Sequence, residues 1–299
     1  MGTAPAGRRR HTAEARSLVL DKRLVIVSGK GGVGKSVVAS GLALLGQRNG
    51  LRILAVEMEA GGGLSAHLGA GDPGFEPREV RPGLHVMRMV RSDALLEYLS
   101  LQLRLPGMGR LGAVARAFDA LATAAPAVRE IVTIGKILWE VREDRWDMVV
   151  FDAPPTGQIA SYLRAPASIS ELVTTGRIRS QSKWMADTLG NPALTKLILV
   201  TLPEELPTTE TMETIEWVAR TGVVGPATVI TNRVLEKVSV SSTPQGAVGD
   251  MLTLHRSLTE EQERWLTELP PDLTLPYMFG LFTPGEVAAH ISDELEALT

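Results

Sequence analysis

The chain has 299 residues, of which 44% are hydrophobic and 22% are charged, as expected of a globular protein with a sizeable buried core. Its net charge of −3 gives no sign of the basic surface that nucleic-acid binding requires, so we expect no nucleic-acid partner. The sequence contains no cysteine, which excludes disulfides, iron–sulfur clusters and the binding of zinc or arsenite through thiols.

The first residues differ in composition from the rest of the chain. Residues 1–20 include Arg8, Arg9 and Arg10 and show no apolar periodicity, which predicts a disordered N-terminal tail. No apolar run is long enough to span a membrane, and the N-terminus lacks the apolar segment of a secretory signal. We therefore expect a cytoplasmic protein.

Short apolar runs recur along the chain and predict buried strands. They cover residues 24–27, 53–56, 84–89, 148–151, 197–201, 227–231 and 273–275. Most of the gaps are long enough for a helix, as at 37–47 and 209–220. This alternation predicts an α/β fold in residues 21–299, with a doubly wound and mostly parallel sheet covered on both faces.

Two gaps, at about 91–146 and 165–196, are too long for simple crossovers and predict helical insertions that form a subdomain. Apolar residues at helical spacing support this prediction in two stripes: Ile131, Ile134, Leu138 and Val141, and Leu111, Val114, Phe118 and Leu121. The stripes either pack against one another or form a groove for a hydrophobic partner segment. Residues 236–250 are rich in polar residues and glycine and predict an exposed loop.

A glycine-rich turn joins the first predicted strand to the first predicted helix. Gly29, Gly34, Lys35 and Ser36 follow the spacing G-x-x-x-x-G-K-S of a phosphate-binding loop, or P-loop. Glycines let backbone N–H groups turn toward phosphate oxygens, and the helix N-terminus adds a positive dipole. We predict an ATP site in which Lys35 contacts the β- and γ-phosphates and Ser36 binds Mg²⁺. The binding residues would be Gly29, Lys30, Gly31, Gly32, Val33, Gly34, Lys35 and Ser36.

Acidic residues follow two of the predicted strands. Asp152 ends the run 148–151, which is typical of a carboxylate that holds Mg²⁺ directly or through water. Glu57 and Glu59 follow the second run and, by strand alternation, point the same way. We expect one of them to lie near the phosphates, and the pattern alone does not decide between them.

Several segments together resemble the ArsA-like P-loop ATPases, a family that includes the tail-anchored-protein targeting ATPase. The P-loop reads G-K-G-G-V-G-K-S, with the extra lysine of the family's deviant Walker A motif, and residues 152–158 read D-A-P-P-T-G-Q where the family has D-T-A-P-T-G-H. Residues 200–211 and 230–234 extend the resemblance. The chain is most similar to the cysteine-free bacterial members, in which a Glu-x-Glu segment, D-A-P-P-T-G and a P-x-x-R-[ED] helix, here Pro126 to Glu130, occur together.

The resemblance implies roles for further residues. Lys30 would reach across a dimer interface to the nucleotide of the partner subunit. Glu59 would stand at the position of the acidic residue that orients the attacking water, and Glu57 at that of an acidic residue two positions earlier. Gly157 would donate an N–H near the γ-phosphate, and Asn232 would hydrogen-bond the adenine.

The expected function is that of an Mg²⁺-dependent ATPase, with Glu59, Lys30, Lys35 and Asp152 in catalysis and Ser36 and Asp152 at the metal. Hydrolysis of ATP to ADP and phosphate would drive a conformational change in a homodimer, or in a heterodimer with a related ATPase. Such a dimer would handle a hydrophobic client or a membrane protein. The alternative is a nucleotide-gated binding module with little intrinsic hydrolysis, because glycines replace the Pro-Ala-His that follows the family's catalytic Asp.

Overall fold

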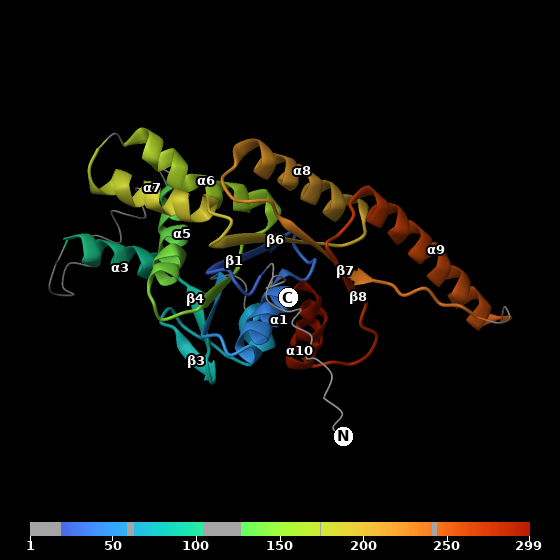
Figure 1. Cartoon of the computed structure of the whole chain (residues 1–299). Helices are drawn as coiled ribbons and strands as arrows, with labels where there is room; N and C mark the ends of the chain where they lie inside the picture. The colour runs from blue at the N-terminus through green and yellow to red at the C-terminus, as the bar shows by residue number, and fades with distance from the viewer. Residues whose placement is uncertain (1–18, 59–62, 104–126, 174, 241–243) are drawn as a thin grey trace, which may run out of the picture.

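The structure, a computed structural model, describes residues 19–58, 63–103, 127–173, 175–240 and 244–299 (Figure 1). Within these ranges an eight-stranded sheet has the order β3-β4-β2-β5-β1-β6-β7-β8. The strands are β1 (Leu24–Gly29), β2 (Ile53–Met58), β3 (Arg78–Arg81), β4 (Leu84–Met89), β5 (Met148–Asp152), β6 (Thr195–Thr201), β7 (Thr228–Val234) and β8 (Leu273–Pro276). All neighbouring strands are parallel except β3 and β4. The predicted α/β fold with a mostly parallel sheet is confirmed.

Helices cover both faces of the sheet. They are α1 (Lys35–Arg48), α2 (Gly63–Leu68), α3 (Arg91–Leu103), α5 (Ala127–Arg142), α6 (Thr156–Leu172), α7 (Arg177–Gly190), α8 (Glu205–Thr221), α9 (Ala247–Glu268), α10 (Pro284–Glu294) and the 3-10 turn η2 (Leu295–Leu298). Figure 1 shows α1 and α10 below the sheet and α6, α7 and α8 above it. The two faces therefore bury two separate apolar cores.

Strand alternation divides the core residues between these faces. Val25 and Val27 of β1 face the core that contains α1 and α10, whereas Leu24 and Ile26 face the core that contains α5, α6 and α8. A strand that is buried on both faces must be apolar at every position, which is why the central strands were predictable as continuous runs.

The edge strand β3 escaped the sequence analysis. Its residues, Arg-Glu-Val-Arg, are half-buried or exposed and contain no apolar run. A charged, antiparallel edge strand of this kind limits pairing with other sheets, and its sequence resembles that of a polar loop.

Helices occupy the described parts of both long gaps. In 91–146 these are α3 and α5, and Ile134, Leu138 and Val141 of α5 are buried in the second core, as their helical spacing predicts. The second predicted stripe, at 111–121, lies outside the described residues. From 165 to 196 the chain continues α6 and forms α7 before β6 begins.

The predicted exposed loop at 236–250 is wrong in its last residues. Helix α9 begins at Ala247, directly after Gly246, which has a positive φ of 68°. A glycine there lets the chain turn into the helix at low cost, and residues 247–250, Ala-Val-Gly-Asp, form the first turn of α9. In the described part of the chain, no helix has both the length and the apolar character that crossing a membrane requires.

Candidate functional site

The candidate site lies where the parallel strands end. Strand β1 lies between β5 and β6, and the loop that follows it turns into α1. In open α/β sheets, ligands bind outside the carboxyl ends of the strands, where successive connections leave a central strand on opposite sides. The fold therefore places the P-loop, residues 29–36, at the position where such a sheet binds its ligand.

Two glycines of the P-loop are required by close contacts. Gly29 has a φ of 151°, and a Cβ on it would lie 2.0 Å from the carbonyl oxygen of Val200 on β6. Gly34 has a φ of 99°, and a Cβ there would lie 2.4 Å from Nδ2 of Asn232 on β7. At Gly29 the obstacle is backbone, so a larger residue would push the loop away from β6, whereas at Gly34 a larger residue would be strained by the positive φ and would displace the Asn232 amide.

Between these two contacts the loop is open. A Cβ built on Gly31 or Gly32 meets no atom within 4 Å. Among the described residues, no side chain caps α1 at Gly34, and the first turn of α1 holds no acidic residue. The amides at the start of a helix need partners, and their dipole favours an anion. The loop therefore has the room and the polarity to receive a phosphate.

Lys35 adds a positive charge to this loop. Its Nζ donates a hydrogen bond of 3.3 Å to the carbonyl oxygen of Lys30, so the side chain folds back over the loop. Burial lowers the pKa of Lys35, and the nearby charge of Asp152 opposes this effect. The ammonium group is thus partly stripped of water and held beside the open amides, where it would strengthen phosphate binding.

Ser36 and Asp152 meet beside the loop. The hydroxyl of Ser36 donates a hydrogen bond of 2.5 Å to Oδ2 of Asp152, whose other oxygen, Oδ1, is buried without a hydrogen-bond partner in the described structure. Burial raises the pKa of Asp152 to about 6, hydrogen bonding to Ser36 and the charge of Lys35 lower it, and the charge of Glu57 raises it further. A hydroxyl beside a carboxylate with a spare oxygen is a donor set that suits Mg²⁺.

Glu57 lies beside Asp152 in the sheet, because the two residues are paired in the register of β2 and β5. Its side chain is fully buried and receives hydrogen bonds from the N–H and the hydroxyl of Ser65, at 3.0 and 3.1 Å. Arg88 on β4 forms an ion pair with the same carboxylate at 2.9 Å. The charge of Glu57 is therefore paired with Arg88, Ser65 ties the carboxylate to α2, and both oxygens of Glu57 already accept hydrogen bonds. Glu59, the other candidate, lies outside the described residues.

The remaining predicted residues also lie around the loop. Asn232 donates a hydrogen bond of 2.9 Å from Nδ2 to the carbonyl oxygen of Val33, and its Oδ1 accepts one of 2.9 Å from the N–H of Arg233. Gly157 is the second residue of α6, and a Cβ there meets no atom within 4 Å. The structure thus brings every described site residue to the carboxyl edge of the sheet.

Comparison with known proteins places this site in a family. A family model described as anion-transporting ATPase matches residues 22–185, more than half of the chain, including β1, the P-loop and Asp152. The chain belongs to the anion-transporting ATPase family.

Relatives within this family differ in how much of the chain they match. ATPase BagA of Mycobacterium tuberculosis is 34% identical over 209 residues, which cover 66% of this chain and 61% of that protein. ATPase ASNA1 homolog 1 of Paramecium tetraurelia is 27% identical over 143 residues, covering 48% and 43%, and ATPase get3 of Neurospora crassa is 25% identical over 177 residues, covering 57% and 52%. The match therefore spans less than two thirds of the length of these relatives.

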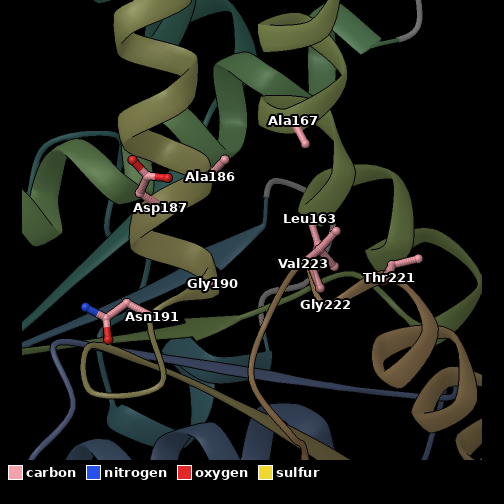
Figure 2. A pocket seen from close by; sticks show the side chains of 9 residues that line it. All are labelled: Leu163, Ala167, Ala186, Asp187, Gly190, Asn191, Thr221, Gly222 and Val223. Atoms are coloured by element: carbon pink, nitrogen blue, oxygen red, sulfur yellow. The ribbon is translucent and has the colours of Figure 1, made fainter.

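A separate pocket, shown in Figure 2, is lined by no residue of the P-loop. It lies between α6, α7 and the end of α8 and is lined by Leu163, Ala167, Ala186, Asp187, Gly190, Asn191, Thr221, Gly222 and Val223. Its one charged lining residue, Asp187, is already paired with Lys183 at 3.0 Å. None of the predicted site residues lines it, so the pocket contributes nothing to the candidate site.

Two side chains at the site were missed by sequence reasoning. Arg88 pairs with Glu57, and Glu210 on α8 pairs with Lys30. Glu210 lies within the segment 200–211 that carries part of the family resemblance, which was the available signal, although that resemblance assigned it no role. Arg88 and Glu210 each lie far in sequence from the residue that they contact, and only the fold brings the two members of each pair together.

Proposed function

We propose that this protein binds ATP in its P-loop with Mg²⁺ and hydrolyses it to ADP and phosphate. The observation that supports this most is the contact between Ser36 and Asp152 at 2.5 Å, beside open loop amides and the ammonium group of Lys35. These groups are those that phosphoryl transfer requires for positioning and charge neutralisation. The family name and the naming of the relatives as ATPases agree with the proposal.

Each group would have its own role in this reaction. The loop amides and Lys35 would hold the β- and γ-phosphates, while Ser36 and Asp152 would hold the metal. Bound Mg²⁺ would neutralise charge on the phosphate oxygens. Because catalysis of phosphoryl transfer relies on electrostatic preorganisation, the fixed positions of these groups would supply most of the rate enhancement.

We assign the orientation of the attacking water to Glu59. The competing residue, Glu57, has its carboxylate occupied by Ser65 and Arg88. Support also comes from Gly63, the described residue nearest to Glu59 on its C-terminal side, where a Cβ would lie 2.9 Å from Oγ of Ser36. Gly63, four residues after Glu59, therefore lies beside the proposed metal ligand Ser36.

Asn232 would recognise the adenine base. Its amide donates one hydrogen bond and accepts one within the protein. A primary amide carries two donor hydrogens and two acceptor lone pairs, so one of each remains for the base. The P-loop contact would hold the amide in a single orientation.

The functional unit would be a cytoplasmic homodimer, or a heterodimer with a related ATPase. Lys30 would contact the nucleotide of the partner subunit, and Gly157 would follow the γ-phosphate as the dimer opens and closes. The client would be a hydrophobic segment or a membrane protein bound through the helices of 91–146 and 165–196. A slowly hydrolysing, nucleotide-gated binding module is the second form of this proposal.

The variant Glu59→Gln tests the proposal. It should bind ATP and Mg²⁺ but hydrolyse ATP about 10²-fold more slowly than the wild type, because the amide cannot accept a proton from water. Sedimentation velocity should then show a dimer with ATP and not with ADP, and the exposed Glu216→Gln on α8 is the matched control.

Equal turnover by Glu59→Gln and wild type would refute the role of Glu59. A wild type that dimerises with ATP but shows no turnover above background would instead support the binding module.

A further inference from the structure

Glu210 links two segments of the candidate site. Its Oε1 pairs with Nζ of Lys30 in the P-loop, and its Oε2 accepts a hydrogen bond of 3.0 Å from the hydroxyl of Thr156. Thr156 is the first residue of α6 and directly precedes Gly157. One carboxylate thus connects the P-loop lysine to the start of the segment proposed to follow the γ-phosphate.

Helix α8 presents this carboxylate from a fixed position. Thr208 and Thr211, on either side of Glu210 in sequence, are buried, and Val218 belongs to the core beneath the helix. Helix α8 packs against α6, β6 and β1, and Figure 1 shows it above the sheet beside α6. Because its backbone is anchored, Glu210 can restrain the side chains that it contacts.

The ion pair between Glu210 and Lys30 is formed in the structure, but it is weak. The hydrogen bond from Lys30 lowers the pKa of Glu210, burial opposes this, and the hydrogen bond from Thr156 lowers it further, so the carboxylate is charged at neutral pH. The side chains of Lys30 and Glu210 are 30% and 36% exposed. Ion pairs with this exposure are weak, so a phosphate could displace the carboxylate from Lys30.

We propose that Glu210 is a positioning residue that holds Lys30 within its own subunit and ties it to Thr156 until Lys30 moves to a phosphate of the partner subunit. This inference rests on the proposed function for the destination of Lys30. A movement of Gly157 would also pull Thr156 away from the carboxylate of Glu210, the same group that releases Lys30. Glu210 would thereby couple dimer closure to the segment after β5.

The first test measures the ion pair itself, in the full chain and without nucleotide. An amine-specific acylating reagent modifies lysine, and peptide mass spectrometry gives the rate at Lys30. Because Glu210→Gln removes the paired charge, we expect labelling of Lys30 to become about two- to fivefold faster. Glu213→Gln, an exposed change on the same helix, should have no effect, and Lys183, paired with Asp187, serves as the internal reference. Equal rates at Lys30 in Glu210→Gln and wild type would overturn the inference.

The second test asks whether Glu210 acts through Lys30. ATP turnover per subunit depends on protein concentration if the dimer is the active form. Glu210→Gln should reach half of its maximal turnover at a protein concentration about two- to fivefold lower than the wild type, because a Lys30 that is free of Glu210 favours the closed dimer. In the Lys30→Ala background the same change should have no further effect, since coupled residues are not additive. An undiminished effect in that background would refute the positioning role.

The two tests separate this inference from the proposed function. If Lys30→Ala leaves turnover unchanged, the proposed role of Lys30 across the dimer is wrong, and the positioning role falls with it. If Lys30→Ala lowers turnover but labelling is unaffected by Glu210→Gln, only the inference about Glu210 fails.

Discussion

Replacing Lys35 with alanine is expected to lower ATP turnover by about 10²- to 10³-fold, a loss typical of removing one preorganised electrostatic group. The half-buried ammonium group lies over the P-loop beside Asp152, and its hydrogen bond to the carbonyl oxygen of Lys30 is long, at 3.3 Å. Its removal would therefore cost little in folding but would leave the phosphate charge uncompensated. Phosphate release at saturating ATP and Mg²⁺ measures the loss.

Two controls separate an effect of Lys35→Ala on catalysis from an effect on the stability of the fold. Lys183→Ala removes the same group from an exposed position on α7 and should hydrolyse ATP at the wild-type rate. The urea unfolding midpoint of Lys35→Ala should stay close to that of the wild type. A Lys35→Ala protein that is folded and retains full turnover would show that the P-loop is not the catalytic site.

Replacing Gly29 with alanine is expected to destabilise the fold by about 3 kcal/mol and to abolish nucleotide binding. The new Cβ would lie 2.0 Å from the carbonyl oxygen of Val200, and the φ of 151° is one that alanine rarely adopts. Backbone atoms form the obstacle, so the end of β1 would have to move away from β6. Urea denaturation measures the loss of stability.

The matched control is Gly31→Ala, in the same loop. A Cβ at Gly31 meets no atom within 4 Å, so the stability of this variant should be close to that of the wild type. If Gly29→Ala and Gly31→Ala were equally stable, the close packing of the P-loop against β6 would be wrong.

The fold was predictable because burial dictates the pattern of its central strands. Residues 24–27 and 148–151 are apolar at each position since helices cover both faces, and the second run is followed directly by the candidate site residue Asp152. The P-loop was equally visible, because its glycines are required by backbone conformation and by contacts with β6 and β7. Local sequence therefore predicted the central strands and the position of the candidate site, but not the edge strand β3.

Partners across the sheet could not be predicted in the same way. Strand alternation placed Glu57 at the correct edge, but its partner Arg88 comes from β4, whose position beside β2 depends on strand order. The pairing of Lys30 with Glu210 likewise joins residues far apart in sequence. Such contacts depend on the packing of whole elements, and no local pattern in a single sequence encodes them.

The central claim is that the bend between β1 and α1 binds a nucleoside triphosphate. Titration calorimetry of the wild-type chain with ATP and Mg²⁺ tests it most directly. Our account predicts a heat of binding that saturates at a single site and disappears in Gly29→Ala. The absence of any binding heat with ATP, and with other purine nucleotides, would contradict it.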